Sequence, residues 1–171
     1  NTSLAMNDWF FLPTMNFTAG TSYRLIFKYK TSGSSFPENL RVMYGTGADN
    51  LSMTNLIKNY PSIVNSTYTT DIIDFVAVGT GTFNIGFQGY SDANMNYIAI
   101  DDISVNVSPA LWTGTNSTDW NDLGNWVNTL STPNSNSIDV EIPNVTNKPV
   151  ISSGTFAVKG LTLYTGTSLS I

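Results

Sequence analysis

The sequence contains no histidine and no cysteine in 171 residues. Without these side chains there is no Ser-His-Asp or Cys-His catalytic pair, no thiolate zinc site, and no haem or iron–sulfur ligation of the usual kind. Positive charge is also scarce, with 7 Lys+Arg against 12 Asp+Glu and a net charge of -5. An acidic chain without basic clusters repels phosphate backbones and anionic lipid. We therefore expect no nucleic-acid partner.

Long apolar runs are absent as well. No stretch of about 20 apolar residues occurs, so we expect no membrane insertion. The chain begins Asn1-Thr2-Ser3 and stops inside an alternating pattern at Leu169-Ser170-Ile171, which we interpret as a piece of a longer polypeptide whose export signal lies outside it. By contrast 20 Asn, 22 Thr and 19 Ser make up more than a third of the chain. Neutral polar surfaces without thiols favour a secreted or cell-surface location.

Period-two alternation dominates wherever periodicity is visible, and this predicts an all-β fold. In Tyr23 to Lys30 the aromatic and leucine side chains share one face, as in a half-buried strand. The same pattern recurs at Leu40 to Tyr44, Ile73 to Ala77 and Phe83 to Phe87. Residues 50–59 lack it, and we expect one irregular helical turn there.

The alternation changes phase at Tyr97 to Val105. Ile98 and Ile100 define one face, whereas Ile103 and Val105 fall on the other. A β-bulge at Asp101-Asp102 would return both pairs to the core. We therefore predict a bulge at these two aspartates.

Beyond Val107 the sequence changes character, with three tryptophans, Trp112, Trp120 and Trp126, inside 15 residues. We place a domain boundary near Ser108 and expect residues 1–107 and 108–171 to form separate units. Short alternating segments at the C-terminal end predict a β-repeat or β-solenoid-like segment. Because a few rungs cannot cover their own ends, such a segment would be truncated.

The first 107 residues carry Asn7 to Pro13 (NDWFFLP), then YRLIFKYK, ENLRVMYGTG and YIAIDDISV in that order. This order resembles the cleaved-adhesin, or choice-of-anchor J, family. The resemblance implies a MAM-like and galactose-binding-like jelly-roll β-sandwich from a large secreted or surface-anchored bacterial protein. Such modules have further strands before the NDW motif. We therefore expect an open sheet edge that takes a strand from a complementing chain or from missing parts of the same polypeptide.

Residues 111–171 are similar to a module of type IX secretion substrates. The similarity rests on WTG, DWN, NW, IP, PVI and GLTL, which recur in that order. These short motifs indicate an extracellular β-repeat and imply no activity.

Candidate ligands for a structural calcium ion are Asp101, Asp102, Glu38 and Asn39. The cleaved-adhesin resemblance implies a calcium site near the Asp-Asp pair, with Asp102 as its main ligand, and Glu38 matches a further acidic position. Calcium takes several carboxylate and amide oxygens, which these residues offer. In the alternative interpretation, all four side chains simply cap turns.

The segment 88–97 has the composition of a sugar-binding loop, because aromatic planes stack on sugar rings and amides or carboxylates bond hydroxyls. Its candidate contacts are Tyr90, Asp92 and Asn94, although any polar loop of an Asn-rich chain looks similar. We expect Trp9 in the core and not on a binding platform.

Two acidic patterns suggest chemistry at first sight. Asp139 and Glu141 share one face of a strand, the spacing of a glycosidase pair, but alternation places them on the solvent side. Residues 119–125 depart from the calcium-loop pattern at Leu123. We expect Leu123 to pack with Trp120 and Trp126 instead.

The sequence therefore predicts a non-catalytic extracellular adhesion or assembly module that binds protein or glycan. The alternative is a carbohydrate-binding accessory domain of a secreted hydrolase or protease.

Overall fold

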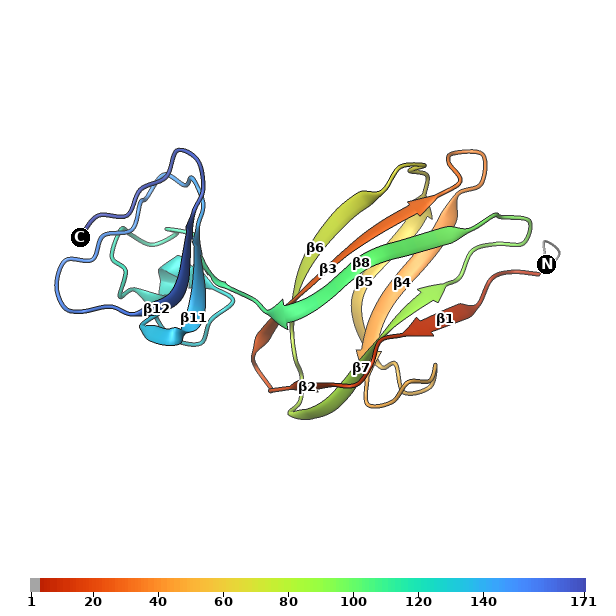
Figure 1. The fold of residues 1–171 in the computed structure, drawn as a ribbon, viewed down its shortest axis with the longest axis horizontal. Helices are drawn as coiled ribbons and strands as arrows, with labels where there is room; N and C mark the ends of the chain where they lie inside the picture. Colours follow the sequence, from red (N-terminus) through yellow and green to blue (C-terminus); the bar gives the residue numbers. More distant parts are fainter. Residues whose placement is uncertain (1–3) are drawn as a thin grey trace. The chain divides into compact units, whose positions relative to one another are not determined.

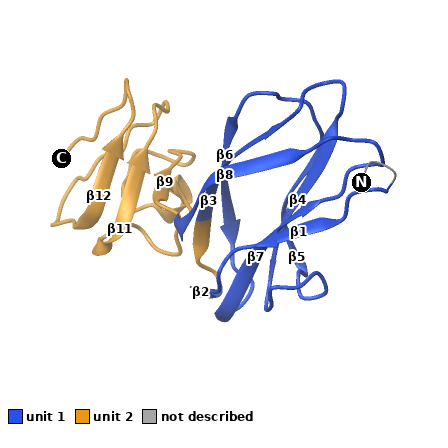
Figure 2. Cartoon of the chain, turned by 45° about the vertical axis from the view of Figure 1, so that its right-hand side comes forward, with its two compact units in different colours: residues 1–19, 24–106 blue, residues 20–23, 107–171 orange. Residues whose placement is uncertain are grey.

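A computed structural model describes residues 4–171. The chain divides into two compact units (Figure 2): the described residues up to Ala19 with 24–106 form the first, and 20–23 with 107–171 form the second. Along the chain the division falls beside Ser108. Residues 20–23 lie outside the expected second segment, and Ser22 explains their place, because its carbonyl accepts a 2.9 Å hydrogen bond from the Ser108 amide.

The first unit is a β-sandwich (Figure 1). Its five-stranded sheet has the order β1-β7-β4-β5, with β2 also paired to β7, and its three-stranded sheet has the order β6-β3-β8. The strands are β1 (Asp8–Phe11), β2 (Met15–Phe17), β3 (Ser22–Thr31), β4 (Glu38–Gly45), β5 (Asn55–Ile63), β6 (Thr69–Val76), β7 (Gly81–Gly89) and β8 (Ile98–Val107). The all-β class expected from alternation is confirmed.

Aromatic contacts fill the space between the two sheets. Phe27 on β3 meets Phe87 on β7 edge to face, with ring centroids 5.1 Å apart. Phe17, Tyr44 and Phe75 form a second cluster toward the other end of the sandwich. Each such ring buries a large apolar area and prefers this tilted geometry.

One expectation for this unit is wrong. Residues 55–63 form strand β5, which pairs antiparallel with β4, and not a helical turn. The sequence of β5 shows no apolar–polar alternation because Lys58, a charged residue, lies opposite the buried Val42 and faces inward. Pro61 is tolerated because β5 is an edge strand.

The region of the expected bulge has an irregular backbone. Asp102 has φ 50°, in the left-handed region that Asp tolerates better than most residues. Both aspartates are exposed, while Ile98, Ile100 and Ile103 are all partly buried. The apolar residues on either side of the pair thus keep their contact with the interior.

The second unit contains β9 (Ala110–Trp112), the 3-10 helix η1 (Leu123–Asn125), β10 (Trp126–Val127), β11 (Ser135–Ile142) and β12 (Val158–Leu163). Its sheet has the order β10-β9-β11-β12, in which β9, β11 and β12 run parallel. Isolated parallel bridges join Val150 to Asp119 and to Ser170. Parallel stacking is the pairing of a solenoid, and the β-repeat itself stays a prediction.

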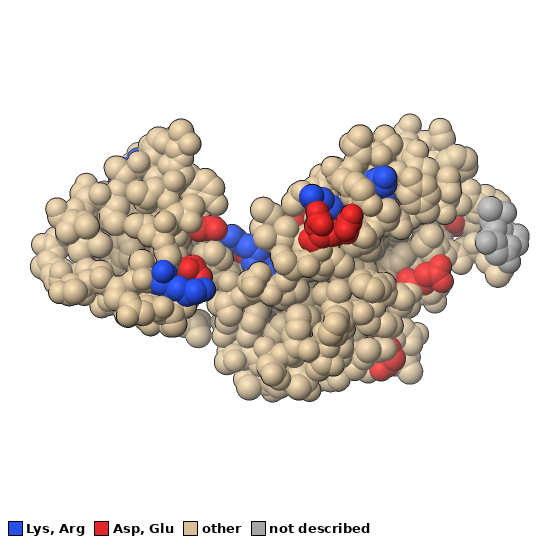
Figure 3. All heavy atoms as spheres, viewed as in Figure 1, with Lys and Arg blue, Asp and Glu red and all other residues tan. Residues whose placement is uncertain are grey.

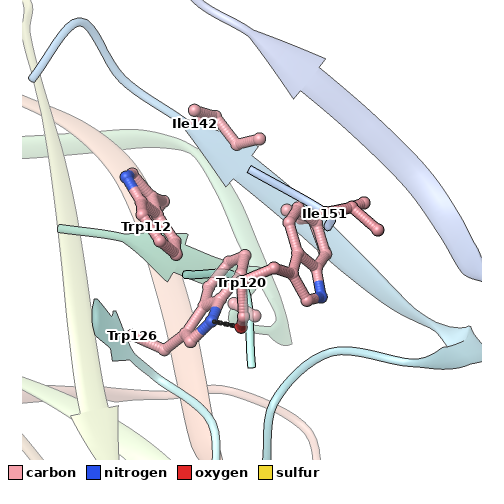
Figure 4. Close-up of a cluster of buried hydrophobic side chains, with 7 residues drawn as sticks. Trp112, Trp120, Trp126, Ile142 and Ile151 are labelled. Carbon is pink, nitrogen blue, oxygen red and sulfur yellow. Dashed lines mark hydrogen bonds between the residues drawn. The ribbon is translucent and has the colours of Figure 1, made fainter. Parts of the chain in front are cut away.

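The core of the second unit is built on its three tryptophans (Figure 4). Trp126 contacts Trp112 and Trp120 edge to face, at 5.0 and 4.7 Å between ring centroids. Its indole N–H donates to the Trp120 carbonyl at 2.9 Å. Leu123 was expected in this core but is 44% exposed, because it begins η1 on the surface.

Asn125 holds the loop around these tryptophans. Its side chain is fully buried, its Oδ1 accepts from the amides of Asn116 and Ser117 at 2.8 Å, and its Nδ2 donates to the Asp119 carbonyl at 2.9 Å. One buried amide side chain therefore bonds three backbone groups of this loop.

We predict that Asn125→Ala lowers the free energy of unfolding of the second unit by about 2–5 kcal/mol, because two amide N–H groups lose their acceptor. Urea unfolding followed by tryptophan fluorescence measures this. Asn121→Ala, an exposed amide in the same loop, serves as the control. Equal stability of the two variants would contradict the assignment.

Asp71 on β6 joins the two sheets on the side of the sandwich formed by β5 and β6. Its Oδ2 accepts hydrogen bonds from Lys58 Nζ at 2.5 Å and from the Tyr60 hydroxyl at 2.6 Å, both on β5. Burial raises the pKa of Asp71, but the Lys58 and Tyr60 hydrogen bonds outweigh it, so this pKa lies below its ordinary value. Burial, and then the Asp71 hydrogen bond, raise the pKa of Tyr60.

A carboxyl group whose pKa is lower in the folded state stabilises the fold above its unfolded pKa, and this stabilisation is lost as the pH falls through the folded pKa. We therefore expect Asp71→Asn to remove about 1–2 kcal/mol of stability at neutral pH, and much less at about pH 2. Urea unfolding across this pH range measures the difference. A loss that stays constant with pH, or that Asp92→Asn reproduces from its exposed loop, would contradict this account.

Candidate functional site

The outward face of the five-stranded sheet carries a straight row of planar side chains. Strand pairing places Trp9 of β1 opposite Gln88 of β7, Gln88 opposite Arg41 of β4, and Arg41 opposite Asn59 of β5. We call these four residues the outer row. Since neighbouring strands lie about 4.8 Å apart, the row is roughly 14 Å long.

Alternation explains why these side chains point outward. Phe87 is buried between the sheets, so Gln88 points to the opposite side, and Leu40 and Val42 do the same for Arg41. All four residues of the outer row are partly or fully exposed. The expectation that Trp9 lies in the core is wrong, because its inward neighbour on β1 is Phe10, which contacts Phe87.

Trp9 forms part of an aromatic platform. Its ring lies parallel to that of Phe11, with centroids 5.6 Å apart and planes 5° apart. Phe11 in turn lies close to Gly86, where a Cβ atom would approach the Phe11 ring to 3.1 Å and Met53 Sδ to 3.0 Å. A larger residue at position 86 would therefore push the platform away from the sheet.

Tyr90 contacts the two residues of the outer row that lie on β4 and β5. The guanidinium of Arg41 lies 4.8 Å from the centroid of the Tyr90 ring, and the Tyr90 hydroxyl donates to Asn59 Oδ1 at 2.6 Å. These contacts hold the Tyr90 ring against β4 and β5. Of the three residues expected to contact sugar, Tyr90 is therefore the one that lies beside the outer row.

The other two candidates lie further along the same loop. Asp92 and Asn94 are exposed, and Asn94 has φ 67° in a turn, a conformation that Asn adopts readily. Within residues 4–171, no hydrogen bond or ion pair joins their side chains to Tyr90. Sequence reasoning missed Arg41, Gln88 and Asn59 because their alignment depends on the pairing of distant strands. Alternation alone assigns Arg41 and Gln88 to an outward face but not to one row.

The residues expected to bind calcium occupy separate places. Asp102 is exposed on β8 and accepts from Lys28 Nζ at 2.6 Å, and Asp101 Oδ1 accepts from the Asp102 amide at 2.8 Å. Asn39 Oδ1 accepts from the Ser62 amide. Within residues 4–171 no three acidic side chains gather as a metal-binding group.

Glu38 differs from these residues because it is fully buried. Its Oε1 accepts from the Asn96 amide at 2.6 Å, while its Oε2 is buried without a hydrogen-bond partner in the part of the chain that the structure describes. A buried carboxylate oxygen without a partner is costly. Of the four residues expected to bind calcium, Glu38 is therefore the one with a carboxylate oxygen that has no hydrogen-bond partner among the described residues.

An open groove of about 260 Å³ lies in the first unit between β1 and β8. Phe10 and Tyr97 line it and are 52% and 42% exposed. Leu40 and Phe87 form part of its floor. Both β1 and β8 are edge strands of their sheets, so the groove lies where the sandwich is open.

Charged groups form small separate patches on the face shown in Figure 3, and most of that face is uncharged. In the second unit, Asp139 forms an ion pair with Lys159 at 2.7 Å. One carboxylate of the Asp139–Glu141 pattern is therefore engaged by a lysine. Among the described residues, no helix has the length and hydropathy needed to cross a membrane.

No protein family matches the sequence, and no curated protein is similar to it. Among solved structures, the chain is similar to a cleaved adhesin domain of Lys-gingipain from Porphyromonas gingivalis, at 18% identity and TM-score 0.50, over 61% of this chain and 66% of that one. Another cleaved adhesin domain of that protein matches at 14% identity and TM-score 0.46, over 58% and 63%. A carbohydrate-binding module of lichenase 5A from Cellvibrio mixtus matches at 18% identity and TM-score 0.36, over 58% and 73%.

The aligned region therefore spans less than two thirds of either adhesin domain. At this level of identity the similarity concerns the fold alone, and it agrees with the jelly-roll sandwich expected from the sequence.

Proposed function

We propose that the chain is a non-catalytic adhesion module of a larger secreted or cell-surface bacterial protein, and that its first unit binds glycan on the outer row. The observation that carries this proposal is the alignment of Trp9, Gln88, Arg41 and Asn59 across four strands. Aromatic planes offer faces to the C–H groups of a sugar ring, and planar amides bond its hydroxyls. A rigid sheet holds these groups in place without a deep pocket.

We infer the kind of parent protein from the family resemblance of the sequence. A choice-of-anchor J module followed by a type IX secretion segment belongs to an exported bacterial protein, and the uncharged surface rich in Asn, Ser and Thr supports this location. Within such a protein, the first unit would provide adhesion and the second unit would act as a spacer. The same outer row would equally serve an accessory domain that holds a hydrolase on its polysaccharide.

A second candidate function concerns the groove between β1 and β8. Exposed Phe10 and Tyr97 beside two unpaired strand edges favour an extended segment, supplied by another chain or by the rest of the same polypeptide. Such a strand would protect the amides of β8 from hydrogen exchange in a longer form of the protein. Glycan on the outer row would leave those amides unchanged.

Calcium remains a proposal that rests on Glu38. Its free Oε2 fits a cation that prefers carboxylate oxygen, whereas Asp101, Asp102 and Asn39 already have partners. When bound, the ion would neutralise the buried carboxylate and stabilise the start of β4.

Glycan binding is tested with Tyr90→Ala. We expect the wild-type chain to bind a subset of a polysaccharide array, and Tyr90→Ala to weaken that binding about tenfold, because Arg41 and Asn59 lose the ring that positions them. Tyr68→Ala is a matched control, since Lys30 lies 4.6 Å from the Tyr68 ring centroid in the same kind of contact. An array without any binding would refute the proposal.

Calcium binding is tested by thermal unfolding in metal-stripped buffer. We expect added CaCl2 to raise the Tm, EDTA to reverse the rise, and Glu38→Gln to abolish it, because a ligand that binds only the folded state stabilises it by mass action. Asp101→Asn should leave the calcium effect unchanged. A Tm independent of calcium in the wild-type chain would disprove the site.

A further inference from the structure

The outer row contains one charged side chain, Arg41, and no carboxylate pairs with it among the described residues. Within residues 4–171, Arg41 forms no ion pair and donates no hydrogen bond, and its recorded contact is with the Tyr90 ring. The other arginine differs, because Arg24 forms an ion pair with Asp74 at 2.9 Å. Lys30 and Lys148 also form no ion pair among the described residues, so the distinctive feature of Arg41 is its place in the middle of the outer row.

The position of Arg41 makes its donors available. It is partly exposed in the middle of the row, with Gln88 on one side and Asn59 on the other. Contact with the Tyr90 ring restrains the guanidinium but satisfies none of its five N–H donors. A planar guanidinium held in this way presents a fork that matches a carboxylate.

Trp9 and Gln88, the other neighbouring pair of the row, offer a hydrogen-bond donor and an acceptor instead of a charge. Trp9 Nε1 and Gln88 Oε1 are both buried atoms without hydrogen-bond partners among the described residues, although Gln88 Nε2 donates to Asn7 at 2.8 Å. One is a donor and the other an acceptor on adjacent strands. A hydroxyl both donates and accepts, so a sugar hydroxyl that displaced the groups covering these atoms would satisfy both of them.

We propose that the outer row binds an acidic polysaccharide, with a uronic-acid carboxylate on Arg41 and a sugar hydroxyl at the Trp9–Gln88 pair. This rests on the proposed glycan-binding function and names its ligand class. A carboxylate beside a hydroxyl is the pattern of a uronic-acid sugar. The net charge of -5 opposes a polyanion at long range, so the preference over a neutral sugar rests on direct contact of one carboxylate with Arg41. A protein ligand would supply carboxylates too, but it offers few hydroxyls for the second position.

The test compares an oligogalacturonate with the same oligomer after its carboxylates are reduced to alcohols. Isothermal titration is carried out in EDTA, so that calcium cannot bridge carboxylates. We expect the wild-type chain to prefer the acidic oligomer, and Arg41→Gln to reduce that affinity about tenfold or more, toward that of the reduced oligomer. Arg41→Lys should retain part of the preference, because it keeps the charge but loses the fork.

Lys30→Gln is the matched control, since it removes a cation from a tyrosine ring on the other sheet. It should change affinity by less than about twofold, and higher salt should weaken the wild-type interaction more than that of Arg41→Gln. Circular dichroism and Tm verify that each variant folds.

The outcomes separate the ligand class from the function. Equal binding of both oligomers would overturn the acidic-ligand proposal while leaving glycan binding in place. A preference for the acidic oligomer that survives Arg41→Gln would place the anion elsewhere and overturn the proposal as well. Binding of neither oligomer would also overturn it, and in that case the polysaccharide array decides separately whether glycan binding itself holds.

Discussion

The contact between Phe27 and Phe87 fixes which side of each sheet in the first unit faces inward. Once Phe87 lies between the sheets, the two-residue period of a strand places Gln88 on the outside. Strand pairing then carries this orientation across to Trp9, Arg41 and Asn59. The candidate binding surface is therefore a consequence of the core, because the same alternation that buries the aromatic rings exposes the polar row behind them.

Sequence periodicity was sufficient to predict the sandwich class and most strands of the first unit. The strand around Phe27 was clear because Tyr23, Leu25, Phe27 and Tyr29 share one face while most residues between them are charged. Strand β5 was missed because Lys58 and Tyr60 face Asp71 across the sandwich, and this polar contact hides the apolar face. A partly exposed ion pair with its hydrogen bonds replaces hydrophobic residues there, so hydropathy alone does not indicate a strand.

The candidate site was predictable only in part, for a related reason. Tyr90 was identified from loop composition, but its partners Arg41 and Asn59 come from strands far away in the chain. Strand register decides which residues meet, and register depends on bulges such as those between β4 and β5. The isolated position of Glu38 likewise required knowing which carboxylates already had partners. Local sequence carries neither kind of information.

The arrangement of the outer row would separate the proposed glycan recognition from stability. Each of its side chains stands on the side of the sheet opposite the Phe27–Phe87 contact, so a substitution in the row should leave that contact in place. Duplicated copies of such a domain can therefore diverge in ligand preference one residue at a time while retaining the same scaffold. In evolutionary terms, the face behind the core is where a substitution can change the surface with little effect on folding.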